Sequence, residues 1–121
     1  MTNVMTKIEI IMNPSKLDKL KQAFNHIGIT GITVTNAMGC GLQKGHTEYY
    51  RGVAVDITFL PKIKVETVVC DVPVDLVIQT ATEILRTGNI GDGKIFTYEL
   101  KEAVRLRTGE RGPDAIREPK P

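Results

Sequence analysis

Hydrophobic and polar residues alternate along four stretches of the chain, at residues 7–12, 32–35, 62–69 and 94–100. Successive side chains of a strand point to opposite faces of a sheet, so this alternation predicts four strands. Between them, two stretches place hydrophobic residues every three to four positions, which is typical of amphipathic helices. The first helical face carries Leu17, Leu20, Phe24 and Ile27, and the second carries Val74, Val77, Ile78, Ala81, Ile84 and Leu85.

The ends of both helices carry residues that are typical of helix caps. Ser15 with Asp18 three residues later resembles a capping box, and Gly28 suits the C-terminal end of the first helix. Asp71 is expected to cap the second helix, and Pro73 to lie in its first turn. Gly88 is expected to end this helix.

The chain therefore repeats a strand–helix–strand unit. Two such units side by side predict a ferredoxin-like α+β sandwich, with an antiparallel sheet and both helices on one face. Some residues of the other face, such as Ile11 and Val68, are also hydrophobic. We expect further copies of the chain to cover that face.

A segment at about residues 41–58 separates the two units and has no clean helical period. Ordering so long a loop without a core is costly, so we expect it to be mobile until a ligand or partner holds it. The alternative is a long β-hairpin, since Val53, Val55 and Ile57 alternate with other residues. We expect residues 1–121 to form a single domain. The end of the chain is rich in Gly, Pro and charged residues, which predicts a flexible tail at about residues 112–121.

Composition is that of one ordinary globular domain: 121 residues, 41% hydrophobic and 25% charged. A net charge of +2 is too small to indicate direct nucleic-acid binding. Cys40 and Cys70 have no metal-site spacing, so we expect two reduced thiols in the cytoplasm. The sequence shows no signal-peptide core and no apolar run long enough for a membrane span.

Three segments carry candidate binding chemistry. Gly91, Gly93 and Lys94 can form an anion-binding turn, although a plain tight turn would use the same residues. If residues 105–107 are a strand, Arg105 and Arg107 face one side and suit phosphate; the alternative is a charged edge strand.

The third segment is the glycine-rich run at residues 39–45. Gln43 offers an oxygen that could bind Mg2+. The alternative is that the glycines form a flexible hinge. Neither His26 nor His46 has a fixed partner for catalysis, so the chain is not expected to be an enzyme.

Together these segments resemble the PII nitrogen-signalling family, over about residues 7–116. The resemblance lies in QKGHTE (43–48), YRG (50–52), FLPK (59–62), GDGKIF (91–96) and RLRTGE (105–110). The run GCGLQK (39–44) is similar to the Gram-positive, ammonium-transporter-linked (GlnK-type) branch.

The resemblance implies a homotrimer that binds ATP or ADP between subunits and carries a long mobile T-loop. The implied nucleotide-binding residues are Ile11, Thr33, Gly39, Cys40, Gly41, Val68, Gly91, Asp92, Gly93, Lys94, Arg105 and Arg107. The implied 2-oxoglutarate-binding residues are Gly41, Gln43, Lys44, Gly45 and Lys62, with Gln43 also holding Mg2+ beside ATP.

The resemblance also implies that the T-loop contacts partners through Tyr49, Tyr50, Arg51 and Gly52. ATP with Mg2+ and 2-oxoglutarate would fold the base of the loop, whereas ADP would leave it free to extend. Arg51 would then block the exit of an ammonium transporter, bringing a cytoplasmic protein reversibly to the membrane. A transcription regulator is a second expected partner.

The chain departs from the family pattern at several positions. Val53 and Val55 stand where relatives carry a modifiable Ser or Tyr, so we expect no uridylylation or phosphorylation there. Leu42 replaces a common arginine, which should weaken the 2-oxoglutarate response, and Asn13 replaces a common lysine. An enzyme, an allosteric domain of one, and a metal-tolerance-type trimer remain alternatives on the same fold.

Overall fold

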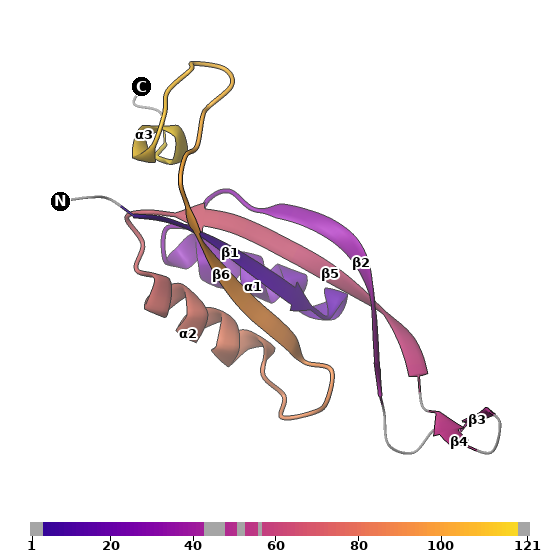
Figure 1. The fold of residues 1–121 in the computed structure, drawn as a ribbon. Helices are drawn as coiled ribbons and strands as arrows, with labels where there is room; N and C mark the ends of the chain where they lie inside the picture. Colours follow the sequence, from indigo (N-terminus) through magenta and orange to yellow (C-terminus); the bar gives the residue numbers. More distant parts are fainter. Residues whose placement is uncertain (1–3, 43–47, 51–52, 56, 119–121) are drawn as a thin grey trace.

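The computed structural model describes residues 4–42, 48–50, 53–55 and 57–118, without the side chains of residues 40–58. The elements are β1 (Met5–Met12), η1 (Pro14–Lys16), α1 (Leu17–His26), β2 (Thr33–Leu42), β3 (Glu48–Tyr50), β4 (Val53–Val55), β5 (Ile57–Val69), α2 (Val74–Leu85), β6 (Gly93–Leu100) and α3 (Pro113–Ile116). Four strands form an antiparallel sheet in the order β2-β5-β1-β6, and α1 and α2 cover one face (Figure 1). This confirms the ferredoxin-like α+β sandwich.

β1 is one of the two inner strands of the sheet, and it joins the repeats because it pairs with both β5 and β6. Ile10 lies opposite Val65 of β5 on one side and Ile95 of β6 on the other. Ile8 and Met12 are fully buried with it, because alternate side chains of β1 face the helices. The hydrophobic core therefore starts at this strand.

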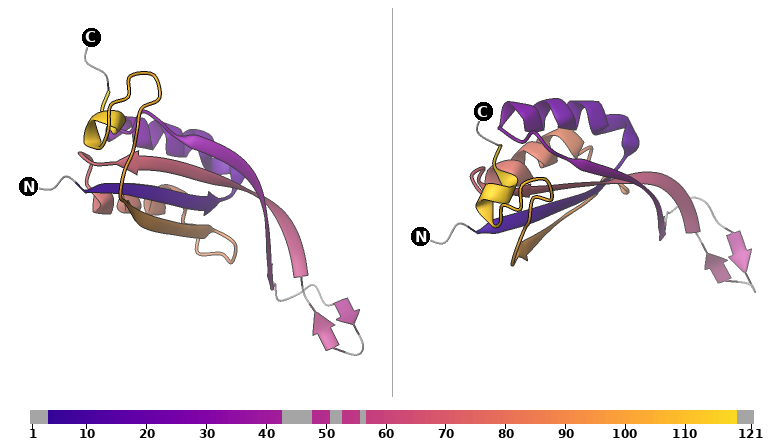
Figure 2. Two further views of the ribbon diagram at one scale, coloured as in Figure 1. Left: turned by 45° about the horizontal axis from the view of Figure 1, so that its top comes forward. Right: turned by 90° about the horizontal axis from the view of Figure 1, so that it is seen from above.

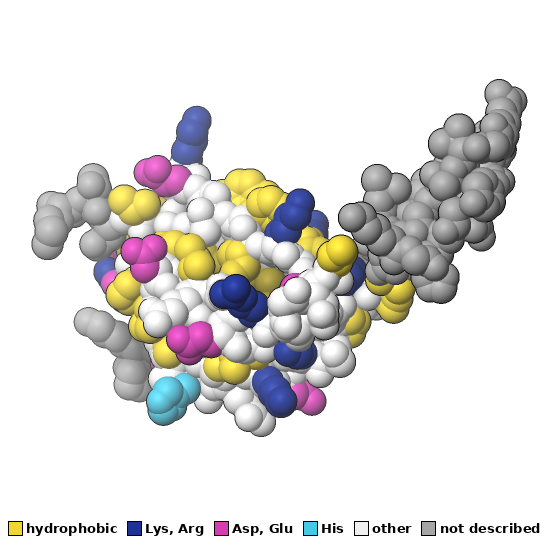
Figure 3. Space-filling model, turned by 90° about the horizontal axis from the view of Figure 1, so that it is seen from below, with side chains coloured by type: hydrophobic (Ala, Val, Ile, Leu, Met, Phe, Trp, Pro, Cys, Tyr) yellow, Lys and Arg dark blue, Asp and Glu magenta, His cyan; other side chains and the backbone are white. Residues whose placement is uncertain are grey.

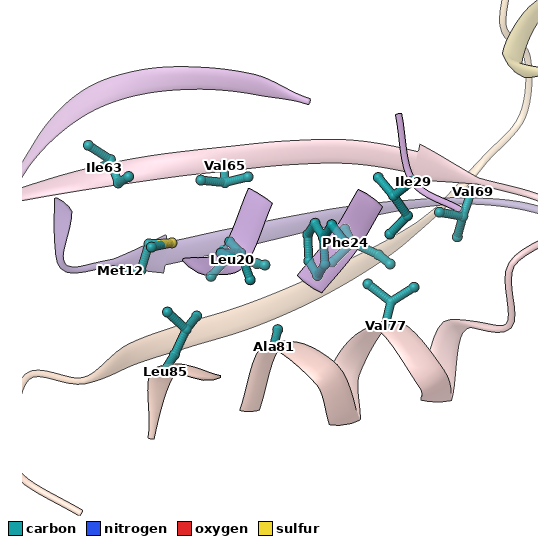
Figure 4. Packing of buried hydrophobic residues seen from close by; sticks show 12 residues of the cluster. Met12, Leu20, Phe24, Ile29, Ile63, Val65, Val69, Val77, Ala81 and Leu85 are labelled. Carbon is teal, nitrogen blue, oxygen red and sulfur yellow. The ribbon is translucent and has the colours of Figure 1, made fainter. Parts of the chain in front are cut away.

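The helices complete the core with the residues that the sequence pattern predicts. Leu20 and Phe24 of α1, and Val77 and Ala81 of α2, are buried between the helices and the sheet (Figure 4). Figure 2 shows the resulting two layers from two further directions. None of the helices in the described part of the chain is long and apolar enough to cross a membrane.

Gly28 closes α1, as predicted. The Ile29 amide donates to the Phe24 carbonyl at 2.9 Å, and the Gly28 amide donates to the Asn25 carbonyl at 3.2 Å. These two bonds form a Schellman motif, which requires the positive φ of +97° that Gly28 adopts. Ile29 is then buried beside Phe24, so the cap also directs the chain back to the core.

The other predicted caps are wrong. Ser15 lies inside the 3-10 turn η1, and α1 begins after Lys16 without a side-chain cap. Pro73 precedes α2 as its cap residue rather than lying in the first turn, while the Asp71 carboxylate binds Arg117. α2 ends at Leu85, before Gly88, because residue 86 is already extended.

Within the residues that are described, the segment between the repeats contains paired strands, as in the alternative β-hairpin. The expected mobility of this segment stays a prediction. β2 and β5 stay paired as far as Leu42 and Ile57, and β3 pairs with β4. Figure 2 shows this two-stranded arm leaving the body of the protein. Backbone pairing provides hydrogen-bond partners for the residues of these paired strands. Residues 43–47, 51–52 and 56, to which the expected mobility also applied, lie outside the described residues.

The sheet face away from the helices is more charged than the sequence pattern suggests. Lys7 pairs with Glu66 at 2.7 Å, and its ammonium lies 5.4 Å from the centre of the Tyr98 ring. The hydrogen bond from Lys7 lowers the pKa of Glu66. Ile11 and Val68 are half-buried on this face. The open face therefore combines a charged ladder with hydrophobic positions.

We expect Leu20→Ala to lower the free energy of unfolding by about 2–5 kcal/mol, because it leaves a cavity in the core. Leu76→Ala is the matched control, since Leu76 also lies on a helix but is 40% exposed. Its cost should stay below about 1 kcal/mol. Denaturant unfolding of both variants at one chain concentration measures the difference, and equal losses would contradict this description of the core.

Candidate functional site

The turn between α2 and β6 is organised by one carboxylate. Asp92 accepts hydrogen bonds from the backbone amides of Thr87 at 2.8 Å and Gly88 at 3.0 Å, and from the Thr87 hydroxyl. The bond from the Thr87 side chain is the main reason that the pKa of Asp92 is lowered. The Asp92 side chain thus stabilises the turn by bonding to the turn's own amides and hydroxyl.

Gly93 lets this turn approach β1 closely. A Cβ at this position would lie 1.8 Å from the Ile11 carbonyl oxygen, and φ is +116°. Only glycine fits such an approach. Lys94 follows directly and is paired in register with Ile11, so the predicted residues Ile11, Gly93 and Lys94 do meet.

Lys62 crosses the sheet surface from β5 to the same turn. Its ammonium donates to Asn13 Oδ1 at 2.6 Å and to the Gly91 carbonyl. Gly39 on β2 gives it room, because a Cβ there would lie 3.2 Å from the Lys62 side chain. The chain thus brings together six predicted residues, which we call the glycine-turn cluster: Ile11, Gly39, Lys62, Gly91, Gly93 and Lys94.

The Lys62 side chain is unusual in its surroundings. Lys62 is only 8% exposed, and both acceptors of its ammonium are neutral oxygens. Among the described residues, no carboxylate forms an ion pair with it. A buried cation without an anionic partner is costly, so this position favours an anionic ligand.

The expectation that Arg105 and Arg107 lie on one strand is wrong. Residues 106–108 form a turn, closed by the Gly109 amide donating to the Arg105 carbonyl at 2.7 Å. The spacing rule for strands does not apply in a turn. Leu106 at its tip is 97% exposed, and the Arg105 side chain is held by Glu110 and by the carbonyl of Arg117.

The predicted nucleotide residues fall into two groups at opposite ends of the sheet. Lys94 lies at the start of β6, whereas Arg105 follows its end, which is about 20 Å away along the strand. Figure 1 shows the turn after α2 and the loop before α3 at these two ends. We call the second group, at the α3 end, the arginine cluster: Thr33, Val68, Arg105 and Arg107.

A hollow lies beside Val68, the one member of the arginine cluster that lines it. It measures about 570 Å³ and is lined by Gly31, Val68, Asp71 and Arg117, among others. At the other end, Figure 3 shows basic side chains between the centre of the α2 face and the arm, whereas acidic ones lie mainly on the opposite half. Neither end of the sheet holds the whole predicted set of nucleotide-binding residues.

Several predicted residues cannot be placed. Gln43, Lys44, Gly45, Arg51 and Gly52 lie outside the described residues, as does His46. For four others, Cys40, Gly41, Tyr49 and Tyr50, only the strand backbone is described. Within the described part of the chain, no group of three or more His, Cys, Asp or Glu residues could hold a metal ion.

Sequence reasoning missed the contacts of Asn13, Asp71, Glu110 and Arg117. In the sequence, Asn13 stood out only as a departure from a family pattern. Its contact with Lys62 was not predicted, because the two residues are 49 positions apart. The partners Asp71 and Arg117 are separated by 46 residues. Nothing local in the sequence marks such pairs.

Comparison with known proteins adds independent information. The family model described as "Nitrogen regulatory protein P-II" matches residues 5–110. A curated relative, the nitrogen regulatory protein P-II of Rhodospirillum rubrum, is 55% identical over 112 residues, which cover 93% of this chain and all of that protein.

Solved structures agree. The structure of the Bacillus subtilis GlnK–ATP complex is 43% identical, with a TM-score of 0.82 over 96% of this chain and 99% of the other. The structure of Arabidopsis thaliana PII bound to citrate is 37% identical, with a TM-score of 0.75 over 93% of this chain and 92% of the other.

We expect Gly93→Ala to destabilise the protein by at least about 3 kcal/mol, because the new methyl group would displace the Ile11 backbone. The control is Gly88→Ala, where φ is +85° but no atom lies within 4 Å. It should cost only the roughly 1–2 kcal/mol of backbone strain. Denaturant unfolding compares the two, and similar losses would show that the close approach at Gly93 is unimportant.

Proposed function

Because the chain belongs to the nitrogen regulatory protein P-II family, we propose that it signals nitrogen status by binding ATP or ADP together with 2-oxoglutarate. The relatives are named as regulatory proteins, and the chain is a regulator rather than an enzyme. One observation carries the proposal: the glycine-turn cluster and the arginine cluster lie at opposite ends of one sheet. We infer that each is one half of a phosphate site.

The two halves meet between neighbouring copies of the chain. The glycine-turn cluster supplies backbone amides and Lys94, and the arginine cluster of the next copy supplies Arg105 and Arg107. Such a head-to-tail contact closes into a ring, which we propose is a homotrimer. The exposed Leu106 at the tip of its loop is then available for burial against a neighbour. The ATP complex of the Bacillus subtilis relative supports a nucleotide as the ligand.

Lys62 is the proposed cation for 2-oxoglutarate. Its buried ammonium has only neutral partners, and a carboxylate would supply the missing charge. A plant relative was solved with citrate, which also carries several carboxylates. We propose that Gln43 holds Mg2+ beside ATP, and that the backbone at Gly41, Lys44 and Gly45 completes the site. Leu42, in place of an arginine, weakens this response.

The arm that includes β3 and β4 is the proposed output of the protein. ATP with Mg2+ and 2-oxoglutarate folds the base of the arm, and ADP leaves the arm extended. Each ligand shifts the balance between the folded and the extended state only by the difference in its affinity for the two. The extended arm presents Tyr49, Tyr50, Arg51 and Gly52 to an ammonium transporter, and a transcription regulator is a second partner. The protein thus remains cytoplasmic, reaches the membrane reversibly, and is not modified at Val53 or Val55.

A shared site predicts complementation between two defective variants. Lys94→Ala and Arg105→Ala should each weaken ATP binding at least tenfold, because each removes a charged phosphate contact. In rings reassembled from a 1:1 mixture, about a quarter of the interfaces should regain both intact halves. Calorimetry with ATP measures the recovered sites. Rings of the Lys94→Ala, Arg105→Ala double variant are the control, and mixed rings without recovery would refute a site shared between chains.

The proposed output predicts ligand-dependent membrane binding. Membranes that contain the ammonium transporter should retain the protein with ADP and release it with ATP, Mg2+ and 2-oxoglutarate. Arg51→Ala should lose retention, whereas Lys19→Ala on the exposed side of α1 should not. Sedimentation followed by immunoblotting measures the bound fraction. Normal retention of Arg51→Ala would remove the proposed role of this residue.

A further inference from the structure

A bidentate ion pair connects the segment around α3 to the end of the sheet. Arg117 donates from Nε to Asp71 Oδ2 at 2.9 Å and from Nη2 to Asp71 Oδ1 at 3.0 Å. Asp71 lies just beyond the end of β5, so the pair ties the chain after α3 to the body. The Arg117 hydrogen bond holds the pKa of Asp71 below its usual range, which keeps the pair charged at neutral pH.

The same residue, Arg117, also holds Arg105. Its backbone carbonyl accepts a hydrogen bond from Arg105 Nη2, while Arg105 Nη1 donates to Glu110 Oε1 at 2.6 Å. Glu110 is itself fixed by the Thr108 hydroxyl at 2.8 Å. Both terminal nitrogens of the Arg105 guanidinium are thus anchored, and its side chain is only 16% exposed.

This anchoring leaves Arg105 able to bind a ligand. A guanidinium has five N–H donors, and the two anchors use one on each terminal nitrogen, so three remain. Because the group is already oriented, it loses less freedom when an anion binds than a loose side chain would. The orientation depends on where the Arg117 carbonyl lies. The Arg117 amide donates to the Pro113 carbonyl at 3.0 Å, and Asp114 lies 3.5 Å from the guanidinium. The bidentate pair with Asp71 is the contact that ties Arg117 to the end of β5.

The ion pair contributes little else. The side chains of Arg117 and Asp71 are 39% and 61% exposed, and such surface pairs add little to stability. α3 itself contains no buried residue among its four, so fastening it does not extend the core. The contact that links the pair to another charged group is the Arg117 carbonyl, to which Arg105 donates.

We propose that Asp71 and Arg117 are positioning residues for the nucleotide: they act through Arg105 and do not contact the ligand. This inference rests on the proposed function, in which Arg105 binds phosphate. The inference gives a role to an ion pair that joins Asp71, after β5, to Arg117, after α3. It also predicts that nucleotide affinity responds to a charge change outside the ligand contacts.

The test is Asp71→Asn, which removes the charge and keeps the size. We expect the Kd for ATP, measured by calorimetry on the full chain, to rise roughly three- to tenfold, as for one weakened charge-assisted hydrogen bond. The melting temperature of Asp71→Asn should differ from that of the wild type by no more than the melting temperature of the control variant, Asp75→Asn, does. Asp75 carries the same charge on the exposed side of α2, and its variant should bind ATP as the wild type does.

A double-mutant cycle separates positioning from a general structural effect. Arg105→Lys keeps a positive charge, so ATP binding remains measurable, but a lysine cannot reproduce the anchored fork. Asp71→Asn should therefore have no further effect in the Arg105→Lys background. A full effect in that background, or wild-type affinity of Asp71→Asn alone, would overturn the inference. A wild-type chain that binds no ATP would instead overturn the proposed function.

Discussion

The burial of β1 between two strands and beneath two helices is the constraint on which the remaining structure depends. Its alternate side chains anchor the core, and its backbone fixes β5 and β6 on either side. Once β6 is held along its whole length, the glycine turn and the arginine loop are forced to opposite ends of the sheet. The separation of the two clusters is therefore a direct result of how the core packs.

The sequence predicted the sheet and both main helices because their hydrophobic periodicity reflects one buried face. The Gly28 cap was also predictable, since its motif lies within six residues. The arm entered only as an alternative, from the alternation of Val53, Val55 and Ile57. The turn at residues 106–108 was not predicted, because no hydrophobic periodicity marks it. The Ser15 prediction failed for a related reason: Pro14 starts a tighter turn, which places Ser15 inside it.

The candidate site was predictable to a similar, limited degree. Gly91, Gly93 and Lys94 are neighbours in the sequence, so a turn suited to anions could be proposed from them alone. The part played by Lys62 came from a family resemblance, and its partners Asn13 and Gly91 follow only from the folded chain. These partners are 49 and 29 positions away from Lys62, and contacts between residues so far apart carry no local signal in a single sequence.

The pairing of β2 with β5 continues to Leu42 and Ile57, so the part of the arm that these two strands form is an extension of the sheet. Lys62 is paired with Ala37 at the root of the arm, and five further residue pairs lead to Leu42 and Ile57. At about 3.4 Å per residue, this ribbon acts as a lever roughly 17 Å long. A rotation of about 20° at its root, within the ordinary range of strand twist, would swing its far end by about 6 Å. A small rotation at the root would thus become a larger displacement at the far end, and the core would not need to rearrange.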